Sequence, residues 1–201
     1  MQQQPAPPTL TLLIQCSGGA NGLHNTLETL RVSAANADLQ PAVLLLPWQL
    51  NKQGTEALTA ACATTTNVRW WEPPAPSASA AESLAWASRQ ANTTWLWWLE
   101  AGDRLQPQAL QQWRMAYGRH PDALLIAGDG EQLNSEGAVI RRHGAPAPTT
   151  RLRQLVQEQL YCPSAFCLQR RLLQLVPLPT AAALHWSYRE AWLLAVLEQC
   201  R

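Results

Sequence analysis

Two carboxylates stand where they could serve one binding site. Glu100 and Asp103 are three residues apart, with Gly102 between them, and both follow an uncharged apolar run. Carboxylate oxygens are the ligands that Mn²⁺ and Mg²⁺ prefer, and these ions usually complete their coordination with phosphate oxygens and water. If the turn between Glu100 and Asp103 is tight, both carboxylates can face one ion.

The elements around the two acids decide where they would lie. Residues 93–99, TTWLWWL, are β-favouring and apolar, which is typical of a strand buried on both faces of a parallel sheet. Pro107 then opens a helical pattern in which Leu110, Trp113 and Tyr117 share a face. In open α/β sheets, ligands bind beyond the carboxyl ends of the strands, and the two acids fall at that position.

The segment over residues 99–110, LEAGDRLQPQAL, resembles a motif of the family 2 glycosyltransferases of the GT-A fold. In that family the motif reads Leu-Asp-Ala-Asp-Asp-Arg-Leu-x-Pro-x-Ala-Leu, and its acids hold a divalent metal and the sugar nucleotide. The resemblance implies that Glu100 and Asp103 bind Mn²⁺ or Mg²⁺ together with the donor. Gly102 stands where the family has its middle acid.

Strand and helix signals alternate along the chain. The expected elements are strands at 9–15, 42–46, 67–71 and 122–127, with helical patterns at 23–34, 56–65 and 79–91. This alternation predicts an α/β fold with a mainly parallel sheet flanked by helices. The resemblance makes the fold GT-A, which is Rossmann-like, in a single domain over residues 9–201. Residues 1–8 are expected to form a disordered tail.

Two further positions are candidates for binding the donor. The turn after the first strand, residues 17–22, lies where the resembling family contacts the nucleotide base, and Asn21 is its surviving polar residue; a plain tight turn is the alternative. The family ends its second strand with an Asp pair that binds uracil or ribose, whereas this chain has Pro47 and Trp48. Trp48 could stack on a base. The family's Arg-Asn pair falls at about Ala80 and Ala81.

The resemblance also suggests an acceptor side and a general base. Asp129 lies in a GDGE segment that is similar to the family's Tyr-Gly-Asp-x-Glu, followed by a hairpin turn at 134–137; a turn-capping Asp is the alternative. In the family, the first Asp of a Glu-Asp-Tyr-Asp-Leu-Trp-Leu-like motif deprotonates the acceptor. Tyr188 occupies that position here, and tyrosine is a poor base at neutral pH. Glu190, two residues on, is the candidate catalytic base, and His185 is a second candidate; for each, a solvated surface residue is the alternative.

Composition narrows the class of protein. With 47% hydrophobic and 14% charged residues the chain is expected to be globular, and a net charge of +1 argues against a nucleic-acid binder. The five cysteines form no CxxC pair, which favours reduced, buried thiols in a cytoplasmic protein. No apolar run approaches the roughly 20 residues that span a bilayer, so no transmembrane segment is expected. Peripheral attachment to a membrane stays open.

These observations predict a family 2-like glycosyltransferase that transfers a sugar from a nucleotide-sugar donor to a hydroxyl of a saccharide or lipid-linked acceptor. The alternative is a non-catalytic GT-A-like binding or scaffolding domain. Four altered motif positions favour that alternative: the Asp pair, the middle acid, the Arg-Asn pair and the general base. Trp95 and Trp97 are expected in the core, whereas Trp48 and Trp71 are candidates for contacts with a sugar or a base. The sequence leaves the oligomeric state open.

Overall fold

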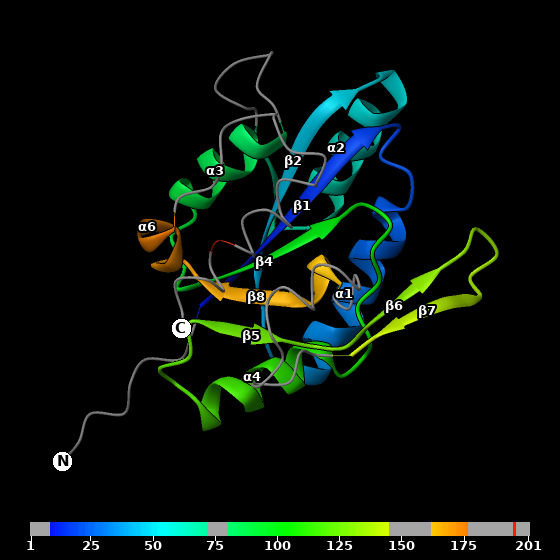
Figure 1. Cartoon of the computed structure of the whole chain (residues 1–201). Helices are drawn as coiled ribbons and strands as arrows, with labels where there is room; N and C mark the ends of the chain where they lie inside the picture. The colour runs from blue at the N-terminus through cyan, green and yellow to red at the C-terminus, as the bar shows by residue number, and fades with distance from the viewer. Residues whose placement is uncertain (1–8, 72–79, 145–161, 177–194, 196–201) are drawn as a thin grey trace.

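A computed structural model describes residues 9–71, 80–144, 162–176 and 195 of the chain (Figure 1). The strands are β1 (Leu10–Gly18), β2 (Ala42–Leu50), β3 (Val68–Trp70), β4 (Trp95–Glu100), β5 (Leu125–Ala127), β6 (Gly130–Leu133), β7 (Val139–His143) and β8 (Phe166–Gln169). The helices are α1 (Leu23–Ala37), α2 (Lys52–Thr64), α3 (Ala80–Gln90), α4 (Ala109–Arg119) and the short α6 (Leu172–Leu175), with a 3₁₀ turn, η1 (Pro163–Ala165).

Six strands form the central sheet in the order β3-β2-β1-β4-β8-β5, and β6 and β7 form a separate hairpin. β3, β2, β1 and β4 are parallel, whereas β8 lies antiparallel between β4 and β5. The prediction of a mainly parallel α/β sheet is confirmed. Beyond the last predicted strand, residues 163–165 form η1 and Phe166 begins a strand inside the central sheet.

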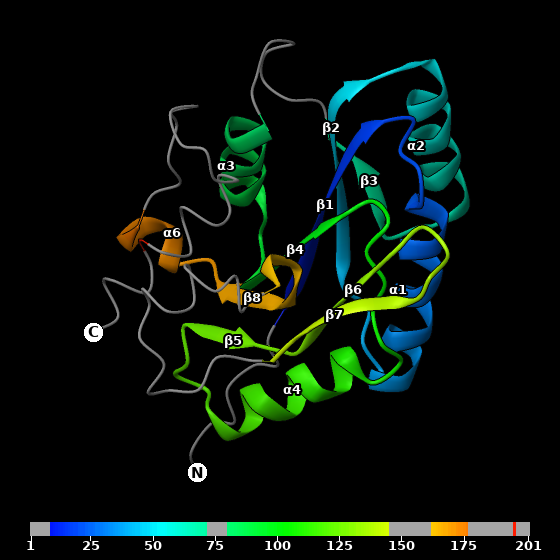
Figure 2. The same ribbon diagram turned by 45° about the vertical axis from the view of Figure 1, so that its right-hand side comes forward.

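The helices cover the two faces of the sheet, as Figure 2 shows: α1, α2 and α4 lie on one face, and α3 and α6 on the other. Alternate residues of each strand enter the two cores because successive strand side chains point to opposite faces. Trp95 and Trp97 lie in the core on the face that α1, α2 and α4 cover, at 1% and 8% exposure, so the prediction that they are core residues is confirmed. Trp95 packs edge-on against Trp113 of α4, with ring centroids 5.9 Å apart.

β2 runs four residues further than the expected 42–46, passing through Pro47. The backbone of Leu45 faces β3, and its carbonyl accepts a hydrogen bond from the Trp71 amide. Pro47 lies two residues further along the strand, so its backbone faces the same side. β3 ends at Trp70, opposite Leu45, so the missing N–H of Pro47 has no strand to bond. A proline is therefore tolerated there, and Trp48 lies within the strand instead of just after it.

Several other boundaries differ from expectation. α2 begins at Lys52 and not Glu56, because the Asn51 side chain accepts a hydrogen bond from the Gly54 amide at 2.9 Å and caps the helix. The expected strand at 122–127 is shorter and lies half-buried at the edge of the sheet. The hairpin prediction is confirmed, with residues 134–138 joining β6 to β7.

Some predictions fall on residues outside the described ones: the disordered tail at 1–8, and Glu190 and His185 as candidates for the catalytic base. Within the described ranges, no helix combines the length and the apolar character needed to cross a bilayer.

Candidate functional site

The two acids share one tight turn at the carboxyl edge of the sheet. Glu100 is the last residue of β4 and lies opposite Gln15 of β1. The Asp103 amide donates to the Glu100 carbonyl at 3.0 Å, and the Glu100 amide donates back to Asp103 Oδ2 at 2.7 Å. Glu100 is exposed and Asp103 is half-buried. The two residues are thus joined by a tight turn, which is what binding of one ion by both carboxylates would require.

Gly102, at the position of the family's middle acid, has a backbone that favours glycine. Its φ is +111°, which side chains rarely adopt. Gly22, which precedes α1 with φ +84°, lies directly against it: a Cβ on Gly22 would lie 2.6 Å from the Gly102 Cα. Glycine packs on glycine here, so the turns after β1 and β4 approach more closely than side chains would allow.

Hydroxyl groups of α1 hold the segment that follows. Thr26 Oγ1, Thr29 Oγ1 and Ser33 Oγ accept hydrogen bonds from the backbone amides of Gly102, Leu105 and Leu110 at 2.9, 3.2 and 3.0 Å. The three hydroxyls repeat at helical spacing and therefore line one face of α1. Sequence reasoning followed the apolar residues of this helix and missed these three. The spacing of these three hydroxyl residues, next to the apolar face of the helix, is the sequence signal that could have identified them.

A third segment reaches Asp103 from far along the chain. The Ser164 hydroxyl of η1 donates to Asp103 Oδ2 at 2.6 Å, across 61 residues of sequence. Residues 162–165, Cys-Pro-Ser-Ala, resemble a segment of the family, but sequence reasoning gave Ser164 no role in the site and missed this contact.

The predicted donor residues lie on the neighbouring strands. Asn21 is exposed in the turn after β1, and its Oδ1 would lie 3.1 Å from a Cβ built on Gly19. Trp48 lies half-buried opposite Ser17, and strand alternation puts it on the α3 face together with Leu46. Both belong to the same carboxyl edge as the acidic turn, because β1, β2 and β4 are parallel.

The other tryptophan considered for a sugar or base contact, Trp71, has a packing role. It lies just after β3 and packs edge-on against Trp86 of α3, with ring centroids 4.7 Å apart. Its ring is therefore engaged with a helix of the fold.

The predicted acceptor residue is separated from the acidic turn by a strand. Asp129 is exposed between β5 and β6, and β8 lies between β5 and β4. The preceding Gly128 amide donates to the Ala165 carbonyl at 2.8 Å, which ties this junction to η1. The structure thus brings Asn21, Glu100 and Asp103 to the ends of adjacent strands and leaves Asp129 further along the edge.

The donor atoms at the acidic turn fit a divalent cation only with help from other ligands. Within the described ranges, no three His, Cys, Asp or Glu side chains gather closely enough to hold a metal. Glu100 and Asp103 supply hard oxygen ligands, and phosphate oxygens and water would have to complete the set. Burial raises the pKa of the Cys16 thiol to about 12, so this residue of β1 stays a neutral thiol at physiological pH and offers neither a nucleophile nor a metal ligand.

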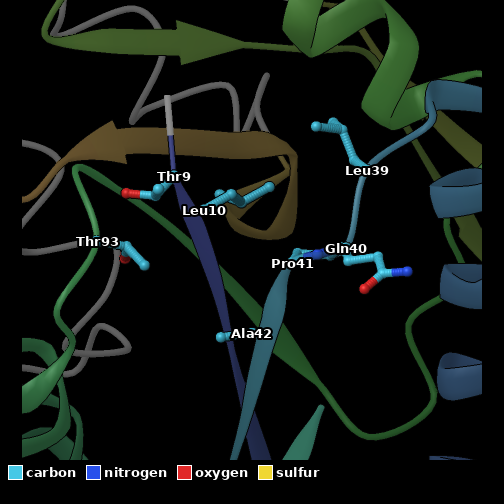
Figure 3. A pocket seen from close by; sticks show the side chains of 7 residues that line it. All are labelled: Thr9, Leu10, Leu39, Gln40, Pro41, Ala42 and Thr93. Atoms are coloured by element: carbon cyan, nitrogen blue, oxygen red, sulfur yellow. The ribbon is translucent and has the colours of Figure 1, made fainter. Parts of the chain in front are cut away.

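A hollow of about 220 Å³ lies at the opposite edge of the sheet (Figure 3). It is lined by Thr9, Leu10, Leu39, Gln40, Pro41, Ala42 and Thr93, at the amino ends of β1 and β2. No charged side chain lines it, so it offers no ionised group for catalysis or for binding a phosphate.

Solved structures share this architecture. S. aureus TarS 1-349 in complex with UDP-GlcNAc matches with a TM-score of 0.69 at 13% identity, covering 94% of this chain and 53% of the TarS 1-349 chain. The mannosyltransferase PcManGT from Pyrobaculum calidifontis, in complex with GDP-Man and Mn²⁺, matches with a TM-score of 0.56 at 13% identity, covering 88% of this chain and 49% of that one. This chain thus spans about half the length of these two solved chains and 33% of the longer TarS chain.

The fold also occurs outside sugar transfer. The 4-diphosphocytidyl-2C-methyl-D-erythritol synthase from Anaerococcus prevotii matches with a TM-score of 0.52 at 10% identity, covering 85% of this chain and 75% of the synthase. No protein-family model and no curated protein sequence matches this chain. These likenesses concern architecture, and on that level the conclusion is plain: the described chain has the Rossmann-like GT-A fold, a mainly parallel sheet flanked by helices.

Proposed function

We propose that this protein is a family 2-like glycosyltransferase that transfers a sugar from a nucleotide-sugar donor to an acceptor hydroxyl. The acidic turn at the carboxyl end of β4 carries the proposal, because it offers two carboxylates at the edge where open α/β sheets bind ligands. Proteins of the same fold are bound to UDP-GlcNAc and GDP-Man, which supports a nucleotide-sugar as the donor.

Each candidate residue has a distinct part in the proposed reaction. Glu100 and Asp103 would hold Mn²⁺ or Mg²⁺, which neutralises charge on the leaving diphosphate when bound. Asn21 and Trp48 would contact the nucleotide, Trp48 by stacking on the base. Asp129 would line the acceptor side, and Glu190 would take the proton from the acceptor hydroxyl. The acceptor would be a saccharide or a lipid-linked sugar.

Calorimetry with UDP and GDP, each with and without Mn²⁺, tests the donor site. We expect weak binding of Mn²⁺ alone and mutual strengthening of cation and nucleotide, because the turn supplies only part of the coordination shell. Asp103→Ala should abolish that coupling. Glu136→Ala, which removes an exposed carboxylate from the hairpin turn, is the matched control and should keep it. Nucleotide binding that ignores Mn²⁺ would contradict the metal role of the turn.

Trp48→Ala tests the stacking role separately. Stacking of a base on an aromatic ring contributes about 1–3 kcal/mol, so nucleotide affinity should fall about tenfold or more. Because Trp48 is half-buried near the end of β2, the melting temperature should stay within a few degrees. Unchanged nucleotide affinity would show that Trp48 is not part of the donor site. Loss of the fold would show that Trp48 is a core residue.

A non-catalytic binding domain is the second candidate, and Gly102 is the observation that favours it. The turn lacks the family's middle acid, and the positive φ at Gly102 opposes any side chain there. This alternative predicts nucleotide binding without turnover. Release of free UDP or GDP from a panel of nucleotide-sugars, with sugars and lipid-linked sugars as acceptors, separates the two: sustained release above the Glu190→Gln background supports the enzyme.

A further inference from the structure

The Asp103 carboxylate is engaged on one side only. Its Oδ2 accepts the Glu100 amide at 2.7 Å and the Ser164 hydroxyl at 2.6 Å. A carboxylate oxygen has two lone pairs, so these two donors occupy Oδ2 fully. Within the described part of the chain, no hydrogen bond goes to Oδ1. The carboxylate therefore presents a single oxygen for any further ligand.

The turn that carries Ser164 is itself anchored on two sides. The Ser164 carbonyl accepts a hydrogen bond from Trp97 Nε1 at 2.7 Å, and Trp97 is a core residue of β4. The next carbonyl, that of Ala165, accepts from the Gly128 amide at 2.8 Å. Since both anchors belong to the central sheet or its immediate extension, the Ser164 hydroxyl is held in place before any ligand arrives.

This geometry has a consequence for the size of the cation. Mg²⁺ and Mn²⁺ take about six oxygens in near-octahedral geometry and suit carboxylates that bind through one oxygen. Ca²⁺ takes about six to eight oxygens and often uses both oxygens of one carboxylate. Two-oxygen binding at Asp103 would require breaking the 2.6 Å bond from Ser164.

We propose that Ser164 is a positioning residue that restricts Asp103 to one-oxygen ligation and thereby favours Mn²⁺ and Mg²⁺ over Ca²⁺. The proposal rests on the metal role of the acidic turn in the proposed function. Ser164 itself touches neither the cation nor the substrate. It acts by occupying Oδ2 and fixing the orientation of the carboxylate, as hydrogen-bond partners of metal ligands do elsewhere.

The test compares how strongly Mn²⁺ and Ca²⁺ each enhance UDP binding, measured by calorimetry on the whole chain. In Ser164→Ala, enhancement by Mn²⁺ should fall about tenfold, because loss of such a partner typically weakens metal binding by that much or more. Enhancement by Ca²⁺ should fall less or rise, so the Mn²⁺-to-Ca²⁺ ratio drops. Ser164→Thr, which keeps the hydroxyl, should restore the ratio. Ser135→Ala, at the exposed hairpin turn, is the matched control.

The outcomes separate this inference from the function on which it rests. If wild-type protein shows no cation-dependent UDP binding, both fall. If wild type shows it and Ser164→Ala leaves the ratio unchanged, or weakens both cations equally, Ser164 has only a structural role and the inference falls alone. Trp97→Phe is a second test, because it removes the indole N–H that bonds the Ser164 carbonyl. Like Ser164→Ala, it should lower the ratio of Mn²⁺ enhancement to Ca²⁺ enhancement.

Discussion

The segment after β4, residues 100–110, is tied to the fold by side chains of other elements, whereas the strands of the β6–β7 hairpin, residues 130–143, pair with each other and not with the central sheet. Three hydroxyls of α1 and one of η1 bond the first segment. The hairpin extends away from the central sheet in Figure 1, and its residues 131–142 are all exposed. The proposed donor side is thus held by long-range hydrogen bonds, while the hairpin beside Asp129, on the proposed acceptor side, can adjust.

The contrast shows how one sheet edge can combine a fixed site with an adaptable one. A cation and a diphosphate need oxygen ligands at set positions, which the bonds around Asp103 supply. An exposed two-stranded ribbon is only marginally stable by itself and can change shape at low cost. The predictions below test this contrast and are ordered by the size of their effect.

Gly22→Ala should destabilise the protein most. The added Cβ would lie 2.6 Å from the Gly102 Cα, at a residue whose φ is +84°. Backbone strain and overpacking together should cost about 2–4 kcal/mol in the free energy of unfolding, measured with urea. Gly137→Ala in the hairpin turn is the matched control, because Gly137 has the same φ and no atom within 4 Å of its Cβ position. It should cost only about 1–2 kcal/mol, and equal losses would refute the close contact between the two turns.

Thr26→Val should cost about 1–3 kcal/mol, because it removes the acceptor of the Gly102 amide and keeps the shape of a fully buried side chain. Thr59→Val on the exposed face of α2 is the control, and should change the free energy of unfolding by less than about 0.5 kcal/mol. If both variants unfold at the same urea concentration as wild type, α1 does not hold the acidic turn.

Native-state hydrogen exchange should separate the two regions directly. The amides of Gly102, Leu105 and Leu110 bond to α1 hydroxyls and should exchange slowly. Amides of the hairpin should exchange faster, because its backbone is exposed and opens locally at low cost. Similar protection in both regions would show that the hairpin is held as firmly as the acidic turn.

Arg142→Ala should have the smallest effect. Arg142 pairs with Glu131 across the hairpin at 3.0 Å, but its side chain is 80% exposed. Exposed ion pairs contribute less than about 1 kcal/mol, so the melting temperature should hardly move. Cooperative loss of global stability in this variant would mean that the hairpin is part of the main folding unit.

Features that depend on local periodicity could be predicted without a structure. The apolar run ending at Leu99 forms the buried strand β4, and Trp95 and Trp97 are core residues. Pro107 precedes α4, which buries Leu110 and Trp113 as their spacing predicted. These features follow from short-range patterns, because burial of a strand or a helix face leaves a period in the sequence.

The surroundings of Glu100 and Asp103 depend on tertiary contacts that cannot be predicted from the sequence of any single segment. β8 enters the sheet between β4 and β5, which brings Ser164 to Asp103, and α1 meets the loop after β4 through Thr26. The backbone of Gly102 packs directly against Gly22. Such contacts join residues more than sixty positions apart, and no local period marks them, because they depend on how the strands are ordered and not on what any one segment prefers.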